Sequence, residues 1–232
     1  MRAIFLADAH LRQPQDKNYQ LLLNFLDQQR GVDALFLLGD IFEFWIGYKH
    51  LAFTPYIPLL ERLRQLVDNG TKLYFVEGNH DFNIGPYFTE ALNCTVIPNQ
   101  KKIDWDGQAL LLSHGDMLNP DPKYQKLRSF WRSWPVRGLA KIVHPDLVWS
   151  FAMWLCAKSP KNNPENRHFD PTPYLLPFAE QSNSDIVISG HYHHPLDLEH
   201  QGTRIIALGD WISQFSYAEM IDGRIELKQF NP

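Results

Sequence analysis

Five short apolar runs in this chain each stop at a small polar cluster, and this arrangement restricts the possible fold more than any other feature. The runs are AIFLA (3–7), ALFLL (34–38), KLYFV (72–76), ALLLS (109–113) and DIVIS (185–189). Their length and their aliphatic composition are typical of buried strands. Open α/β sheets place their sites at the carboxyl ends of strands, so the polar clusters are candidates for one shared site.

Amphipathic segments separate the first three runs. Segments 18–31 and 57–70 show helical apolar spacing and end at a Gly, which predicts a βαβαβ opening and a sheet covered by helices. Further strands follow, and a hairpin turned at Asp222-Gly223 closes the chain. We therefore expect one α/β domain over residues 1–232, interrupted by a helical insertion at about 120–168.

The polar clusters are DAH (8–10), GD (39–40), GNHD (78–81), HGD (114–116) and GHYH (190–193). One Asp or His at a strand end is usually a capping residue, but five such clusters together indicate a site. On extended backbone, residues i and i+2 point the same way, so DAH and HYH could each address one ion. The candidate metal ligands are Asp8, His10, Asp40, Asn79, His114, His191 and His193. Oxygen and imidazole donors without thiolate suit Mn²⁺, Fe, Zn²⁺ or Mg²⁺, and this number of ligands suits two ions that share a carboxylate.

In order and spacing, these clusters resemble the motif series of the calcineurin-like metallophosphoesterases. The resemblance implies an α/β fold, a two-sheet β-sandwich flanked by helices, with two divalent metal ions bridged by Asp40. One ion would be held by Asp8, His10, Asp40 and His193, and the other by Asp40, Asn79, His114 and His191. It also implies that His80 acts on the phosphate as general acid or charge stabiliser, and that Asp81 orients His80.

A narrower resemblance lies outside the ligands. Segments GDIFEFWIG (39–47), GNHDFNIG (78–85) and HGDMLNPDPKYQKLR (114–128) look like the UDP-2,3-diacylglucosamine hydrolases of lipid A biosynthesis. This implies a pyrophosphatase that releases UMP and 2,3-diacylglucosamine 1-phosphate, and an insertion that forms a cap for the acyl chains. The implied substrate contacts are Asn79, His80, Asp121, Tyr124, Arg128, Ser159, Asn163, Arg167 and His191. His80 stands where many of these hydrolases have Arg, and Asn166 stands where a Lys is expected.

The insertion concentrates bulky aromatic residues. Four of the seven Trp, residues 131, 134, 149 and 154, fall within 24 positions. Pro135 and Pro145, together with basic residues, interrupt the stretch, so it does not suit a bilayer span. An interfacial helical hairpin tolerates these residues, with Trp at headgroup depth and Arg132, Arg137 and Lys141 beside anionic lipid. The alternative is that these Trp simply pack the insertion against the body.

Charge and cysteine content favour a cytoplasmic protein. A net charge of −4 gives no general electrostatic reason to bind nucleic acid, and the two cysteines form no disulfide framework. The apolar run at the N-terminus is too short for a signal peptide. We expect a peripheral enzyme on the cytoplasmic face of the inner membrane that uses Mn²⁺ and needs no obligate protein partner.

Two other functions stay open at this stage. One is a metallophosphoesterase acting on another nucleotide or phosphodiester with an apolar group. The other is a non-catalytic scaffold on the same fold, which would usually have lost ligands, whereas here every ligand position is filled.

Overall fold

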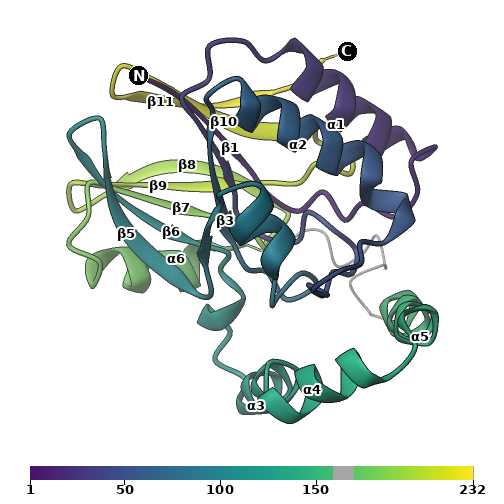
Figure 1. The fold of residues 1–232 in the computed structure, drawn as a ribbon. Helices are drawn as coiled ribbons and strands as arrows, with labels where there is room; N and C mark the ends of the chain where they lie inside the picture. The colour runs from purple at the N-terminus through teal and green to yellow at the C-terminus, as the bar shows by residue number, and fades with distance from the viewer. Residues whose placement is uncertain (159–169, 232) are drawn as a thin grey trace.

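Two sheets packed face to face form the body of the protein in the computed structural model, which describes residues 1–158 and 170–231 (Figure 1). The first sheet has the order β11-β10-β1-β2-β3-β4, in which β1 to β4 are parallel. Its strands are β1 (Arg2–Leu6), β2 (Ala34–Leu37), β3 (Lys72–Val76), β4 (Thr95–Ile97), β10 (Ser216–Ile221) and β11 (Arg224–Gln229).

The second sheet has the order β5-β6-β7-β9-β8, with β6, β7 and β9 parallel. Its strands are β5 (Gln100–Trp105), β6 (Gln108–Ser113), β7 (Ile186–Ser189), β8 (Pro195–His200) and β9 (Thr203–Leu208). The carboxyl ends of the parallel strands of both sheets meet at one edge of the body (Figure 1). The predicted two-sheet α/β fold is confirmed.

Alternation along the strands builds two separate apolar layers. In β1, Phe5 faces the second sheet and stacks on Phe36 with ring centroids 4.6 Å apart, whereas Ile4 and Leu6 face the helices. This is the period of two expected for a strand buried on both faces, which is why these strands read as continuous apolar runs.

Helices cover both outer faces of the sandwich. Helices α1 (Lys17–Gln28) and α2 (Ile57–Asp68) pack on the first sheet, and α6 (Thr172–Glu180) packs on the second. Short turns occupy 54–56, 87–91 and 116–118. The layers are therefore helix, sheet, sheet, helix, with both helical layers leaving the site edge open.

The insertion forms three helices that lie below the site edge as an arm (Figure 1). They are α3 (Pro122–Trp131), α4 (Trp134–Ile142) and α5 (Pro145–Ala157), and we call them the cap. Ala152 is the only fully buried residue in these helices. In the part of the chain that the structure describes, no helix combines the length and apolarity required to cross a membrane.

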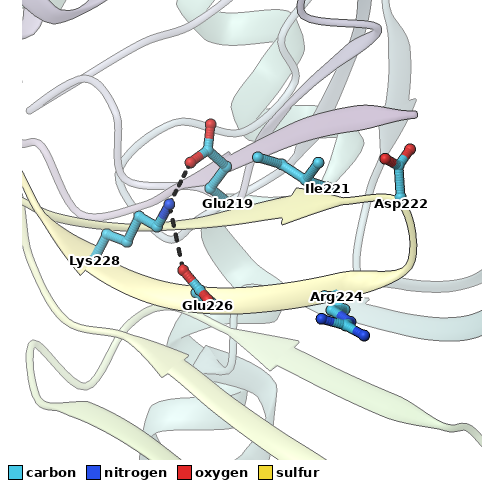
Figure 2. A pocket seen from close by; sticks show the side chains of 6 residues that line it. All are labelled: Glu219, Ile221, Asp222, Arg224, Glu226 and Lys228. Atoms are coloured by element: carbon cyan, nitrogen blue, oxygen red, sulfur yellow. Dashed lines mark hydrogen bonds and ion pairs between the residues drawn. The ribbon is translucent and has the colours of Figure 1, made fainter.

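The outermost strand β11 protects the edge of the first sheet with charge. Lys228 lies 2.6 Å from a Glu219 oxygen and 3.4 Å from a Glu226 oxygen, beside a shallow hollow on the β10–β11 hairpin (Figure 2). Charged side chains on an edge strand discourage pairing with another chain. The hollow is lined by side chains of this hairpin, and it lies away from the strand ends that carry the candidate site.

Candidate metal centre

The structure brings all the predicted metal ligands together at the carboxyl ends of the strands. Three groups of ligand atoms lie within 4.8 Å of one another: Asp8 with His10 and His193, His10 with Asp40 and His80, and Asp40 with His114 and His191. Asn79 joins the last group, because its Oδ1 lies 3.2 Å from His114 Nε2. The ligands come from five strand ends, and both sheets contribute.

Asp40 lies at the centre of this arrangement. Its Oδ2 is 3.6 Å from His10 Nε2 on one side and 3.4 Å from His114 Nε2 on the other. Asp8 Oδ1 is 3.4 Å from His193 Nε2, on the side of His10. A central carboxylate with a cluster of donors on each side is the arrangement that two cations sharing one ligand require.

Buried polar atoms without partners test whether cations fit. Asp8 Oδ1, His10 Nε2 and Asp40 Oδ2 are buried and have no hydrogen-bond partner among the described residues. Unsatisfied buried oxygen and nitrogen atoms are costly, and here they all converge on one space. The donor set of carboxylate, amide and imidazole therefore fits divalent metal ions.

The electrostatics point the same way. Burial alone would raise the pKa of Asp40, but the imidazoles of His114, His80 and His10 lower it well below its usual range. Burial lowers the pKa of His114, yet the carboxylates of Asp40 and Asp8 outweigh it and raise that pKa to about 10. The buried carboxylates thus need positive charge beside them, which protons or metal ions can supply.

The backbone reaches this geometry in a way that simple alternation did not predict. The φ angles are 52° at Asp8, 44° at His10, 52° at Asp40, 73° at His191 and 52° at His193. These ligands sit in left-handed conformations just beyond the strands, so the expected extended i, i+2 arrangement is wrong. Strained backbone of this kind is common where a site must aim several side chains at one point.

Two glycines permit the close approach of the ligand turns. A Cβ at Gly78 would lie 2.3 Å from Asp40 Oδ1, and one at Gly39, whose φ is +82°, would lie 2.7 Å from His114 Nδ1. Only a residue without a side chain fits at either position.

His80 lies beside the metal ligands, with its ring centroid 4.7 Å from that of His10. Its Nδ1 donates a hydrogen bond of 2.9 Å to the backbone oxygen of Glu43. Burial lowers the pKa of His80, so the neutral ring carries its proton on Nδ1 and its lone pair on Nε2. Nε2 is then the nitrogen not bonded to Glu43, and it can donate to a phosphate oxygen once it takes up a proton.

Asp81 has a different role from the one expected. Its carboxylate accepts backbone N–H bonds from Gly78, Asp40, Ile41 and Phe42 at 2.7–3.1 Å, and the described residues show no bond from it to the His80 ring. Asp81 therefore ties the turn after β2 to the turn after β3, and orients His80 only through the backbone.

The predicted substrate contacts in the cap are placed less uniformly. Asp121 is the exposed N-cap of α3, and Tyr124 turns a buried hydroxyl without a partner inward. Arg128 is already paired, at 2.5 Å with Asp116 and 2.9 Å with Asn99. Ser159, Asn163 and Arg167 lie outside the described residues.

Sequence reasoning missed three residues around the centre. Glu43 is a buried carboxylate 3.4 Å from His10 Nδ1, and it stands out as the one charge in IFEFW. Asp210 Oδ2 lies 3.9 Å from His193 Nδ1 and follows β9 in the sequence ALGD, a sixth strand-end cluster that repeats the pattern. Arg132 donates to the Gly78 carbonyl at 2.7 Å, and no sequence signal distinguishes it from the other basic residues of the cap.

The cap Trp residues divide between two surroundings. Trp149 packs on the body, with its ring 4.7 Å from Phe53 and 5.5 Å from Tyr56. Trp134 and Trp154 are 78% and 53% exposed. The interpretation that these Trp pack the insertion against the body therefore holds for Trp149, and the interfacial interpretation stays a prediction for Trp134 and Trp154.

Known proteins are similar to this chain in the sequence and the fold that build this geometry. The profile of the family described as "Calcineurin-like phosphoesterase" matches residues 1–195. The chain is 35% identical to a UDP-2,3-diacylglucosamine hydrolase of Pseudomonas aeruginosa over 92% of each chain. It is 32% identical to one of Shewanella piezotolerans over 98% of this chain and 97% of the other. Among solved structures, it is similar in fold to an archaeal phosphodiesterase, with a TM-score of 0.52 at 11% identity, covering 99% of this chain and 100% of that one.

Proposed function

We propose a diphosphate hydrolase activity for this chain, which belongs to the calcineurin-like phosphoesterase family. The substrate is UDP-2,3-diacylglucosamine, and the products are UMP and 2,3-diacylglucosamine 1-phosphate. The observation that carries the proposal is a full set of candidate metal ligands gathered beside a cap with exposed apolar side chains. The hydrolase relatives support it, since they match nearly the whole chain.

Two divalent cations, Mn²⁺ in our proposal, would be held by the seven residues gathered at the strand ends. When bound, such ions acidify water and neutralise charge on a phosphate. Asp40 separates the two groups of donors and keeps them at a fixed spacing, because Asp81 bonds its backbone N–H and Gly78 leaves room for its side chain. Once protonated, His80 would donate from Nε2 to a diphosphate oxygen, and its hydrogen bond to the Glu43 carbonyl holds the ring in place.

The cap would receive the acyl chains. Nine large apolar side chains of α3, α4 and α5 are at least 40% exposed: Leu127, Phe130, Trp134, Leu139, Ile142, Leu147, Phe151, Trp154 and Leu155. A water-soluble phosphodiester has no apolar chain to bury on such a surface. Burying each CH₂ of an acyl chain there contributes about 0.8 kcal/mol to the free energy of binding.

The same surface supports a peripheral membrane location on the cytoplasmic face. Exposed Trp and the nearby exposed Arg137 and Lys141 are suited to the interface of an anionic leaflet. Arg132 does not take part, because its side chain is only 15% exposed and is paired with Glu77.

The test compares UMP release from UDP-2,3-diacylglucosamine in mixed micelles with hydrolysis of bis(p-nitrophenyl) phosphate, with Mn²⁺ and with a chelator. We expect Mn²⁺-dependent UMP release that Asp40→Asn abolishes and that Asp104→Asn, an exposed carboxylate on β5, leaves unchanged. Hydrolysis of the small diester alone would favour another phosphodiester substrate. No hydrolysis of either compound by protein that has bound Mn²⁺ would favour a non-catalytic scaffold.

A further inference from the structure

A further group of ligating side chains joins the turns of the metal centre to the cap. Glu43, His80 and Cys156 offer ligand atoms that all lie within 4.8 Å of one another. They come from three segments: the turn after β2, the turn after β3 and the last turn of α5. Cys156 is thus the one sulfur donor in the groups of possible metal ligands among the described residues.

The distances suit a tetrahedral cation. Cys156 Sγ lies 3.7 Å from His80 Nδ1 and 3.5 Å from the backbone oxygen of Glu43. Zinc bonds of about 2.3 Å to sulfur and 2.0–2.1 Å to nitrogen place the two atoms roughly 3.5 Å apart in a tetrahedron. The Sγ and Nδ1 atoms are therefore already within a few tenths of an ångström of this spacing, and Glu43 supplies a third donor within 4.8 Å.

The present contacts also resemble a site in which protons take the place of a cation. Both the Cys156 thiol and His80 Nδ1–H donate to the same Glu43 oxygen. Burial raises the pKa of the Cys156 thiol to about 12, so the sulfur is protonated and not a ready nucleophile. A cation of high sulfur affinity can displace that proton, because metal binding favours thiolate.

We propose that Glu43, His80 and Cys156 form a third cation site, selective for Zn²⁺ and similar thiophilic divalent ions, that fastens the cap to the body. On binding, the thiol releases its proton to solvent, and the His80 proton moves from Nδ1 to Nε2. Nδ1 is then occupied by the ion in place of its bond to the Glu43 carbonyl, so the ring cannot form the imidazolium that a general acid at Nε2 requires. The site thereby acts as a brake on turnover, and its existence does not depend on which phosphate ester the centre hydrolyses.

Thiophilic metal binding is measured with Cd²⁺, whose bond to thiolate gives an ultraviolet charge-transfer band. The protein is first loaded with Mn²⁺, and Cd²⁺ is then titrated into the wild type, Cys156→Ser and Cys94→Ser. Cys94 is the matched control, because it is the other cysteine of the chain, is buried in the first-sheet core and lies apart from these ligands. Cd²⁺ that replaces Mn²⁺ at the strand ends gives no band, since those donors include no sulfur.

We expect one equivalent of band-forming Cd²⁺ in the wild type and in Cys94→Ser, and none in Cys156→Ser. His80→Ala should weaken this binding at least tenfold. A wild type without the band, a band that persists in Cys156→Ser, or an unchanged affinity in His80→Ala would overturn the site. Melting temperatures, with Cys156→Ala as a second variant, identify any misfolded protein.

The brake is tested separately by adding Zn²⁺ to the Mn²⁺ enzyme with the small diester as substrate. We expect Zn²⁺ to inhibit the wild type and Cys94→Ser at least tenfold more strongly than Cys156→Ser. Equal inhibition of all three would show that Zn²⁺ acts only by replacing Mn²⁺, and the brake would be wrong.

Discussion

Several residues of this centre each contact two neighbouring groups. Asp40 lies between the two groups of ligands, and Glu43 contacts His10 with its carboxylate and His80 with its backbone oxygen. Asp81 gathers the backbone of two turns. Because these residues share their partners, we expect their substitutions to be non-additive.

The affinity for Mn²⁺ should decrease as the pH is lowered, and it should decrease more steeply below about pH 7. Burial and the charge of Asp40 raise the pKa of Asp8 to about 7, and that of His114 is raised to about 10. Below about pH 10 Mn²⁺ must displace the His114 proton, and below about pH 7 also that of Asp8, with roughly a tenfold loss per proton per pH unit. Neighbouring carboxylates raise the pKa of His10 as well, so its proton adds to the loss. Calorimetric titration of metal-free protein at pH 6, 7 and 8 measures this. An affinity that is constant from pH 6 to pH 8 would contradict this prediction. So would a pH dependence that disappears in His200→Asn, because His200 is a half-buried histidine paired with Glu180, away from the ligands.

His80→Ala should lower turnover by roughly 10²–10⁴, the usual loss for a general acid or base. Metal content should stay at the wild-type value, because the ligands around Asp40 are untouched. The measurement combines kcat on the nucleotide substrate with metal analysis of the same sample. Loss of metal together with activity would place His80 among the ligands instead.

The strand-end ligands could be predicted because each follows a recognisable apolar run, and parallel strands bring such ends together. The role of Asp81 could not, since GNHD places it next to His80 in sequence, while three of its four backbone partners lie 39–41 residues away. Glu43 and Arg132 were missed for the same reason: their partners are set by tertiary contacts and not by local pattern.

At the scale of elements, α3 connects the cap to the metal centre. Arg128 and Arg132, one turn apart, bind Asp116 after β6 and Glu77 after β3. Arg132 also donates to the Gly78 carbonyl, next to the ligand Asn79. Helix α3 therefore supports two ligand turns, a role that its polar sequence did not reveal.

Arg132→Gln should weaken Mn²⁺ binding roughly 10–100-fold, the usual loss when a partner behind a metal ligand is removed. Arg137→Gln is the matched control, because Arg137 is an exposed basic residue of the same cap. Saturating Mn²⁺ should restore most of the turnover of Arg132→Gln on the small diester. A defect that excess Mn²⁺ leaves unchanged, or an equal defect in Arg137→Gln, would mean that Arg132 only stabilises the cap.

At the scale of the molecule, the body and the cap are built by different rules. The body has apolar layers on both sides of each sheet, and alternation in the sequence predicted them. The cap places Trp149 against the body and leaves Trp134 and Trp154 exposed, and composition could not separate these. That division decides which Trp can meet a lipid.

Trp134→Ser with Trp154→Ser should reduce binding to anionic vesicles and use of the diacylated substrate roughly tenfold or more, given about 1.5–3 kcal/mol per buried large side chain. Hydrolysis of the small diester should stay unchanged. Trp149→Ala, the matched substitution on the inner side, should instead lower the free energy of unfolding by up to about 3 kcal/mol and affect both substrates alike. Vesicle sedimentation, both assays and thermal melting measure these effects. A melting temperature lowered equally by the outer and inner substitutions would show that all three Trp are core.

A set of helices with one buried residue is also a set of helices whose backbone amides are poorly protected from exchange with solvent. Local opening needs little free energy where few apolar contacts must break, so deuterium should enter α3 and α4 long before it enters β1 or β7. Acyl chains lying on these helices would supply the interior that the chain itself leaves out. The lipid would then complete the apolar core of the cap and would also be the ligand that the cap binds.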